Sequence, residues 1–279
     1  MSVPRVTLPS GDEIPVVGKG TYRLDGETAE TAVSAALDVG YTHIDTAEGY
    51  MNESEIGEVL AKHDRDDLFL TSKVLAKNLG YESVIDACES SLERLGTDYL
   101  DLYLIHWPNP AISLRETMNA METLYDRGLV RNVGVSNFSR YQLSAAMHIS
   151  DVPIAVNQIE FHPYLQRPKL REYCQDNDVT VEAAAPLART EVLDDPTIEE
   201  IAEKHGRMPA QVVLRWAIEK DAVVLPRSTS AEHIQQNIDL FGWDLDAEDR
   251  HRIDELDRDE PVYDVRGRSW DDDVWGIAE

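Results

Sequence analysis

The chain has 279 residues, of which 42% are hydrophobic, and it carries 53 acidic against 26 basic side chains. This length suits a single α/β domain, which we expect to span residues 1–279. Long-range repulsion from a formal net charge of -27 argues against nucleic acid or a membrane surface as a partner. Without a signal peptide or an apolar run near the roughly 20 residues that cross a bilayer, a cytoplasmic protein is expected.

The acidic residues are spread over many expected helix faces and form no single tail. Such a charge is tolerable in a cytosol of very high salt, where screening shortens the reach of repulsion to about 3 Å. A halophilic protein is therefore our hypothesis, with an ordinary acidic protein as the alternative. Cys88 and Cys174 lack CxxC spacing, which predicts a reducing compartment, no catalytic thiol and no metal site.

The expected elements begin with a β-hairpin at residues 6–16, where two short extended runs flank a Pro-Ser-Gly-Asp turn. A brief strand at 18–22 and a helix at 28–39, with Asp25 as candidate N-cap, lead to a strand that ends at Asp45. The loop beyond holds Tyr50. Asn52, with a glutamate three residues later, matches a capping box for a helix at 52–63.

Strands and helices then alternate to the end of the chain. Strands are expected at 68–74, 99–106, 130–136, 154–159, 179–184 and 222–226. Helices are expected at 81–95, 114–127, 140–148 with a Ser139–Gln142 capping box, 169–176, from Asp195, 209–218, 231–238 and after Asp246. Eight strand–helix repeats without a GxGxxG fingerprint predict a (β/α)8 TIM barrel in preference to a doubly wound sheet.

Four side chains at expected strand ends form a candidate active site, because barrel chemistry gathers at the carboxyl ends of the strands. Asp45, Tyr50, Lys73 and His106 come from three consecutive βα units. A lysine ammonium beside the phenol is expected to lower its pKa, an aspartate to balance the ammonium, and a histidine to hold a carbonyl oxygen. The set suits a carbonyl that receives a hydride. Taken singly, such an aspartate is more often a helix cap, such a tyrosine is more often a packing residue, and such a lysine or histidine is usually solvated.

The chain resembles the aldo-keto reductase family from residue 6 to about residue 257. The resemblance is carried by GYTHIDTAEGYMNE, TSK, YLDLYLIHWP, VGVSNF, NQIEFHP and LPRS. It implies a (β/α)8 barrel with an N-terminal hairpin and a C-terminal extra helix and tail, and reduction of aldehydes or ketones to alcohols with NAD(P)H. It also implies a catalytic tetrad of Asp45, Tyr50 as general acid, Lys73 and His106.

The resemblance also implies the binding residues. The expected cofactor is NADP(H), with NAD(H) left open as a second cofactor. The implied cofactor contacts are Thr21, Tyr22, Asp45, Ser136, Asn137, Gln158, Leu187, Arg227, Ser228, His233, Gln236 and Asn237. The implied substrate pocket consists of Tyr22, Tyr50, His106 and Trp107.

The sequence departs from the family pattern at several cofactor positions. Ala184 stands where an aromatic residue commonly stacks on the nicotinamide, so this stacking is absent or supplied elsewhere. Arg227 replaces a lysine that binds the adenosine 2′-phosphate, His233 replaces an arginine and Gln236 a glutamate. Arg189 is a further candidate for local positive charge.

Two alternatives remain open: a barrel that binds the cofactor without turnover, and a Schiff-base enzyme that uses Lys73 as nucleophile. Small α-keto or sugar-derived carbonyls are the expected substrates at the level of the family. The tail at 259–279, with Tyr263, Trp270 and Trp275, is a candidate cover for the pocket. A monomer is expected, with a dimer as the alternative.

Overall fold

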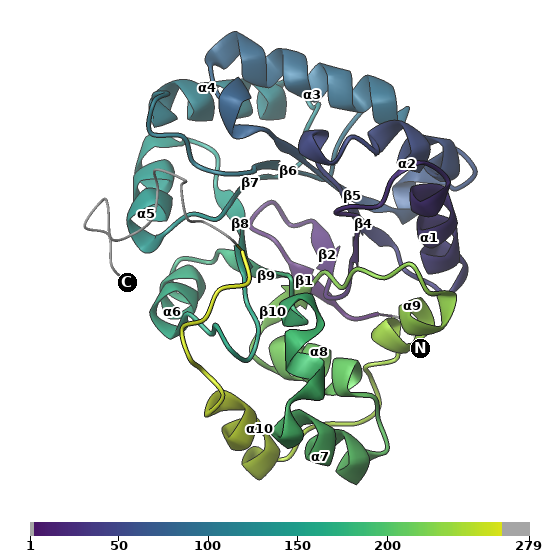
Figure 1. The fold of residues 1–279 in the computed structure, drawn as a ribbon. Coiled ribbons are helices and arrows are strands. Elements are labelled where there is room, and N and C mark those ends of the chain that lie inside the picture. The colour runs from purple at the N-terminus through teal and green to yellow at the C-terminus, as the bar shows by residue number, and fades with distance from the viewer. Residues whose placement is uncertain (1–2, 264–279) are drawn as a thin grey trace.

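The computed structural model describes residues 3–263, so Trp270 and Trp275 lie outside the described residues. Parallel strands surround a central axis and helices cover their outer side (Figure 1). Neighbouring strands follow the chain order: β3 (Lys19–Gly20), β4 (His43–Asp45), β5 (Phe69–Val74), β6 (Leu102–Ile105), β7 (Val133–Ser136), β8 (Ile154–Glu160), β9 (Thr180–Ala184) and β10 (Ala222–Val224). A parallel bridge between Val17 and Val224 joins the two ends of this sheet, which confirms the expected barrel.

The helices between the strands confirm the predicted alternation. They are α1 (Gly26–Asp38), α2 (Glu53–Leu60), α3 (Tyr81–Leu95), α4 (Leu114–Asp126), α5 (Arg140–Ile149), α6 (Pro168–Asp176), α7 (Pro196–His205), α8 (Pro209–Glu219) and α9 (Ala231–Ile238). The expected extra helix is α10 (Ala247–Asp254), and short 3-10 turns are η1 (Glu48–Tyr50), η2 (Arg65–Asp67), η3 (Ala76–Asn78) and η4 (Ala188–Asp194). None of the helices in residues 3–263 combines the length and the apolarity that a bilayer span requires.

The predicted hairpin is present as antiparallel strands β1 (Arg5–Thr7) and β2 (Glu13–Pro15). Leu8 and Ile14 are buried in one apolar cluster with Phe69 and Leu102, the first residues of β5 and β6. The amino-terminal end of the barrel is therefore closed by the hairpin, which leaves the carboxyl end for a site.

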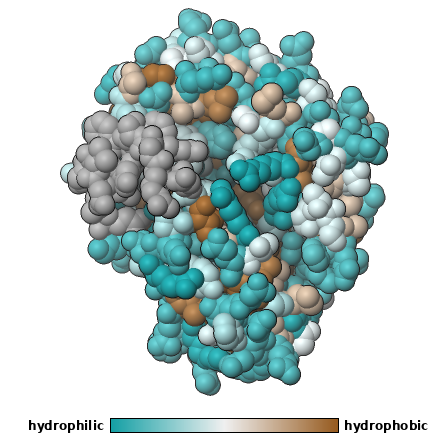
Figure 2. All heavy atoms as spheres, in the orientation of Figure 1, coloured by the Kyte–Doolittle hydropathy of each residue, from teal (hydrophilic) through white to brown (hydrophobic). Residues whose placement is uncertain are grey.

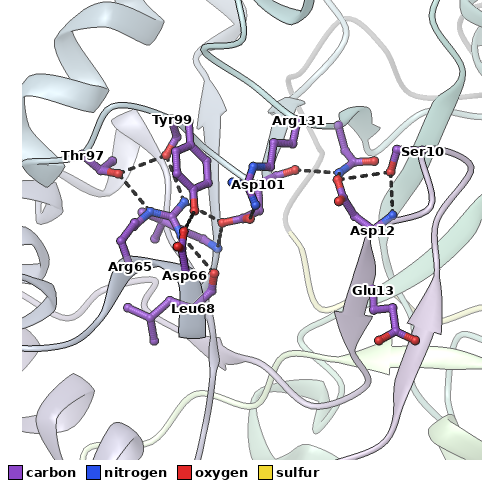
Figure 3. A network of polar contacts seen from close by, with 12 residues as sticks. Ser10, Asp12, Glu13, Arg65, Asp66, Leu68, Thr97, Tyr99, Asp101 and Arg131 are labelled. Carbon is purple, nitrogen blue, oxygen red and sulfur yellow. Dashed lines mark hydrogen bonds and ion pairs between the residues drawn. The ribbon is translucent and has the colours of Figure 1, made fainter.

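A polar network lies at the amino-terminal ends of β5, β6 and β7 (Figure 3). The guanidinium of Arg65 donates to the Asp101 carboxylate at 2.6 Å, and Arg65 and Arg131 flank the Tyr99 ring at 3.9 and 3.8 Å. Asn132 extends the network by donating to Asp12, in the loop between β1 and β2, at 2.8 Å. The network thus attaches the hairpin loop to the barrel.

The expected capping box at Asn52 is wrong, whereas the one at Ser139 is confirmed. The buried Asn52 side chain accepts from the Thr46 hydroxyl at 2.8 Å and donates to the carbonyl oxygens of Thr21 and Leu24 at 2.9 and 2.7 Å. Burial makes these carbonyls dependent on a side-chain donor, so Asn52 connects the loops after β3 and β4 and does not cap its helix.

Candidate active site

The four residues of the expected tetrad lie where successive strands end. Asp45 is the last residue of β4, Lys73 is in β5 and His106 follows β6. Tyr50 ends η1 in the loop after β4. That loop is held by the Glu48 carboxylate, which accepts from the backbone N–H of residue 75 at 2.9 Å and from the amide of residue 78 at 2.6 Å.

Lys73 is the centre of the cluster. Its ammonium donates to Asp45 Oδ1 at 2.7 Å, to the Thr46 carbonyl oxygen at 2.9 Å and to the Tyr50 hydroxyl oxygen at 3.3 Å. Lys73 and Asp45 are buried, and Tyr50 is half-buried. The ring of His106 lies edge-on to that of Tyr50, with 5.5 Å between the ring centroids. The structure therefore brings all four predicted residues together.

The pKa of Tyr50 departs from the sequence-based expectation, because it lies well above the usual value for tyrosine. Burial contributes most, and the charge of Asp45 acts in the same direction. The expected lowering by Lys73 does not prevail over this burial and over the carboxylate of Asp45, which lies 2.7 Å from the ammonium. The hydroxyl of Tyr50 stays protonated at neutral pH, which suits a proton donor.

A second carboxylate, which the sequence-based reasoning missed, lies behind the cluster. The side-chain amide of Gln158 donates to Asp45 Oδ2 at 2.9 Å and to Glu182 Oε2 at 3.0 Å. Glu182 is buried in β9, where burial and the charge of Asp45 raise its pKa to about 8. Its signal in the sequence is an acidic residue inside the apolar run of an expected central strand.

The polar residues at the ends of β7 and β8 form a continuous group. The Asn137 side chain donates to the Ser136 hydroxyl at 2.9 Å and to the carbonyl oxygen of His106 at 3.0 Å. The backbone N–H of Asn137 donates to the Gln158 carbonyl at 2.8 Å. Thr21 is buried, and its hydroxyl donates to the Asp45 carbonyl at 2.8 Å. These positions offer amide and hydroxyl groups next to the tetrad.

The expected phosphate-binding residues lie between β10 and the first turns of α9. Arg227 is exposed, and its guanidinium donates to the Arg23 carbonyl oxygen at 3.0 Å. The Ser228 hydroxyl accepts from the backbone N–H of Ser230, the N-cap of α9, at 3.1 Å. His233 is exposed in the first turn of α9, Gln236 is half-buried and Asn237 is buried.

This donor set fits a nicotinamide dinucleotide. A cationic fork and a helix N-terminus suit a phosphate, and amide and hydroxyl side chains suit a carboxamide. Ala184, half-exposed at the end of β9, places no ring in the space that an aromatic side chain would fill. Leu187, another expected contact, is half-buried immediately before η4.

The C-terminal segment contributes Tyr263 beside the expected substrate residue Trp107, with 6.3 Å between their ring centroids. The buried carboxylate of Glu160 accepts from the backbone N–H groups of Val262 at 2.6 Å and of Tyr263 at 3.1 Å. The Tyr263 ring also lies under the guanidinium of Arg189, at 5.6 Å. The ring of Tyr22 packs near that of Tyr50, with 5.1 Å between the ring centroids.

A closed parallel barrel with its polar cluster at the carboxyl ends of the strands is the architecture of the (β/α)8 class of enzymes. The model of the Aldo/keto reductase family matches residues 16–258. The chain belongs to the aldo/keto reductase family. It is an NAD(P)H-dependent oxidoreductase of the kind that reduces carbonyl groups.

Individual relatives agree with this assignment. An aldo-keto reductase of Mycolicibacterium smegmatis is 42% identical over 257 residues, covering 91% of this chain and 94% of the relative. A glyoxal reductase of Bacillus subtilis is 42% identical over 260 residues, with 92% and 94% covered. The crystal structure of an aldo/keto reductase from Brucella melitensis superimposes with a TM-score of 0.88 at 42% identity, covering 92% of this chain and 100% of that one. That of a Bombyx mori aldo-keto reductase in complex with NADP has a TM-score of 0.89 at 32% identity, with 95% and 96% covered.

Proposed function

We propose that this protein reduces a small aldehyde or ketone to the alcohol with NADPH, and that Tyr50 donates the proton. The observation that carries the proposal is the 3.3 Å contact between the Lys73 ammonium and the Tyr50 oxygen, beside a buried Asp45 that holds the lysine at 2.7 Å. Proton donors and fixed charges arranged in this way stabilise the oxyanion that develops when a carbonyl carbon accepts a hydride.

Each side chain has one task in this mechanism. When bound, the reduced nicotinamide supplies the hydride. The Tyr50 hydroxyl gives its proton to the carbonyl oxygen, and the Lys73 ammonium stabilises the phenolate that remains. Asp45 fixes the position of the lysine, and the His106 imidazole orients the carbonyl oxygen. A phenol with a raised pKa holds its proton until charge builds up on that oxygen.

Replacing Tyr50 tests this mechanism. Tyr50→Phe removes only the hydroxyl, so we expect kcat for a carbonyl substrate to fall by about 100-fold or more, as is typical for loss of a general acid. Affinity for NADPH, measured by quenching of protein fluorescence, should change little. Turnover at the wild-type rate in Tyr50→Phe would refute the assignment of the proton donor.

The cofactor preference rests on Arg227 and Ser228. A planar guanidinium can pair with a phosphate through two hydrogen bonds. We expect Arg227→Ala to raise KM for NADPH by about tenfold, the effect of losing a charge-assisted hydrogen bond, while KM for NADH stays nearly constant. An equal rise in KM for both cofactors would show that Arg227 does not bind the 2′-phosphate.

The substrate class is proposed from one relative and from the site. That relative is named a glyoxal reductase, so small aldehydes and dicarbonyls are the first compounds to assay. A spectrophotometric panel of aldehydes, ketones and alcohols with both cofactors, in molar KCl, identifies the best substrate.

The two alternative functions are less well supported. The Lys73 side chain is buried and donates to three oxygens, so it lacks the free, accessible amine that a Schiff-base nucleophile needs. Borohydride trapping of an adduct at Lys73 would nevertheless establish that chemistry. If the barrel only binds the cofactor, NADPH would quench the protein fluorescence. Adding a carbonyl compound would then cause no loss of NADPH absorbance.

A further inference from the structure

Lys19, a residue of β3 that the proposed mechanism does not use, has a buried amine beneath the expected phosphate site. Its side chain is 1% exposed, and its ammonium donates to the Ser228 carbonyl oxygen at 2.5 Å. Within residues 3–263, this carbonyl is the only hydrogen-bond acceptor of the ammonium. A lysine is almost never fully buried without a charged partner, so this arrangement calls for a functional explanation.

The strand that carries Lys19 is in direct contact with the segment that carries Arg227. The backbone N–H of Gly20 donates to the Pro226 carbonyl at 3.2 Å. A Cβ atom on Gly20 would lie only 2.9 Å from the Leu225 carbonyl oxygen, so no larger residue fits there. The ammonium of Lys19 is therefore held at a fixed place under the loop between β10 and α9.

The surroundings of Lys19 favour its neutral form, chiefly because the side chain is buried. Burial and, secondarily, the Arg227 guanidinium lower the pKa of Lys19 to about 7. On the neighbouring strand Lys19 pairs in register with Ile44, so the titratable His43 and Asp45 point to the opposite face. Among the described residues, Lys19 forms no ion pair with the charged or titratable residues of the flanking helices α1 and α9, which are Glu27, Glu30, Asp38, Glu232 and His233.

We propose that Lys19 is a positioning residue of the 2′-phosphate site, and that its amine takes up a proton from solvent when the phosphate binds. This inference rests on the proposed use of NADPH at Arg227 and Ser228. A phosphate dianion above the loop adds the negative charge that the buried amine lacks, so binding favours the ammonium form. The ammonium in turn holds the Ser228 carbonyl and adds to the positive potential around the phosphate.

The uptake of a proton by Lys19 determines how the affinity for NADPH changes with pH. Below the pKa of the free protein, Lys19 is already charged and NADPH binds tightly. Above it, binding must include the uptake of a proton, so affinity falls as the pH rises. We expect Kd for NADPH to rise by about tenfold between roughly pH 7 and pH 8.5, and Kd for NADH to stay nearly constant.

Calorimetric titration of the whole protein measures the proton directly. NADPH and NADH are titrated in molar KCl at about pH 8, where the second ionisation of a phosphate, with a pKa near 6, is complete. Two buffers with different enthalpies of ionisation give the number of protons exchanged. We expect close to one proton to be taken up with NADPH and almost none with NADH.

Variants assign the proton to Lys19. Lys19→Met should abolish uptake and give a weak, pH-independent Kd for NADPH, while Lys19→Arg, which stays charged, should abolish uptake and keep the binding tight. His233→Gln is the control, because His233 is the other titratable candidate, and it should retain the uptake. If Lys19→Met does not fold, Lys19→Arg and the comparison of the two cofactors in the wild type still test whether Lys19 takes up the proton.

The outcomes separate this inference from the proposed function. Tight NADPH binding without proton uptake, or uptake that survives in Lys19→Met and disappears in His233→Gln, overturns the role of Lys19 and leaves the proposed cofactor intact. Failure to bind NADPH while NADH binds overturns the proposed cofactor and the role of Lys19 together.

Discussion

At the scale of single residues, one side-chain amide connects two carboxylates of this site. Gln158 donates to both Asp45 and Glu182, and the two acids differ in what surrounds them. Asp45 has the Lys73 ammonium at 2.7 Å, whereas the pKa of Glu182 rises to about 8 because the residue is buried and faces the charge of Asp45. The geometry thus makes Asp45 the charged partner of the lysine and keeps Glu182 neutral at and below neutral pH.

The raised pKa of Glu182 has a consequence for stability. Between its ordinary value near 4.5 and about 8, the folded protein holds a proton that the unfolded chain releases. The free energy of unfolding therefore falls as the pH rises through this interval, with a slope of at most about 1.4 kcal/mol per pH unit. Below the interval this contribution to stability is fully present.

Glu182→Gln removes this titration and retains the side-chain shape. We expect the free energy of unfolding of the variant, measured with urea, to depend less on pH than that of the wild type between about pH 5 and pH 8. The variant should become more stable relative to the wild type as the pH rises. Glu203→Gln, on the exposed face of α7, serves as the control. Parallel pH profiles for wild type and Glu182→Gln would contradict the assignment.

At the scale of elements, the segment after α10 is fastened to the loop that follows β8. Backbone N–H groups of Arg258 and Glu260 donate to the Tyr164 carbonyl at 3.1 and 3.0 Å, and Glu160 accepts from the two residues that follow the proline at 261. The ring Nε2 of His162 donates to the same Glu160 carboxylate at 2.8 Å. These contacts hold Tyr263 against Trp107, at the side expected for the substrate.

Loosening this anchor should change substrate binding more than chemistry. Glu160→Gln replaces one acceptor oxygen by an N–H donor that faces backbone N–H groups, so we expect the segment to detach. KM for an aromatic aldehyde should rise by about three- to tenfold, and kcat should stay within about twofold, because the tetrad is untouched. Glu203→Gln is again the control. An unchanged KM for both bulky and small aldehydes would show that the segment does not line the substrate pocket.

At the scale of the whole molecule, net charge is the dominant property. The face shown in Figure 2 is covered mainly by hydrophilic side chains, and the chain has twice as many acidic as basic residues. A net charge of -27 destabilises a compact state through self-repulsion unless salt screens it. The halophile hypothesis and the single domain over residues 1–279 stay predictions.

Stability should accordingly depend on KCl. We expect the free energy of unfolding to rise by about 2 kcal/mol from dilute buffer to molar KCl, equivalent to about 5 °C in Tm for a chain of this size. Thermal unfolding followed by circular dichroism measures it, with sucrose at equal osmolality as the control for solvent exclusion. The same Tm in dilute buffer and in molar KCl would disprove the halophile hypothesis.

The sequence by itself determined the order of strands and helices and the barrel, because hydrophobic periodicity and turn residues are local signals. It also predicted which residues meet at the active site, since strand ends converge in a barrel. Strand lengths were predicted less accurately: β6 is Leu102–Ile105 instead of 99–106, and before it only an isolated parallel bridge pairs Leu100 with Val130.

Only the tertiary structure decided the electrostatics and the roles of buried polar groups. Asn52 holds two loops and does not cap its helix, and the pKa of Tyr50 is raised where a lowering was expected. Glu182 and Lys19 emerge as titratable groups only once their burial is known. The reason is physical: desolvation and the field of a charge depend on distances between residues far apart in the chain, which no local pattern contains.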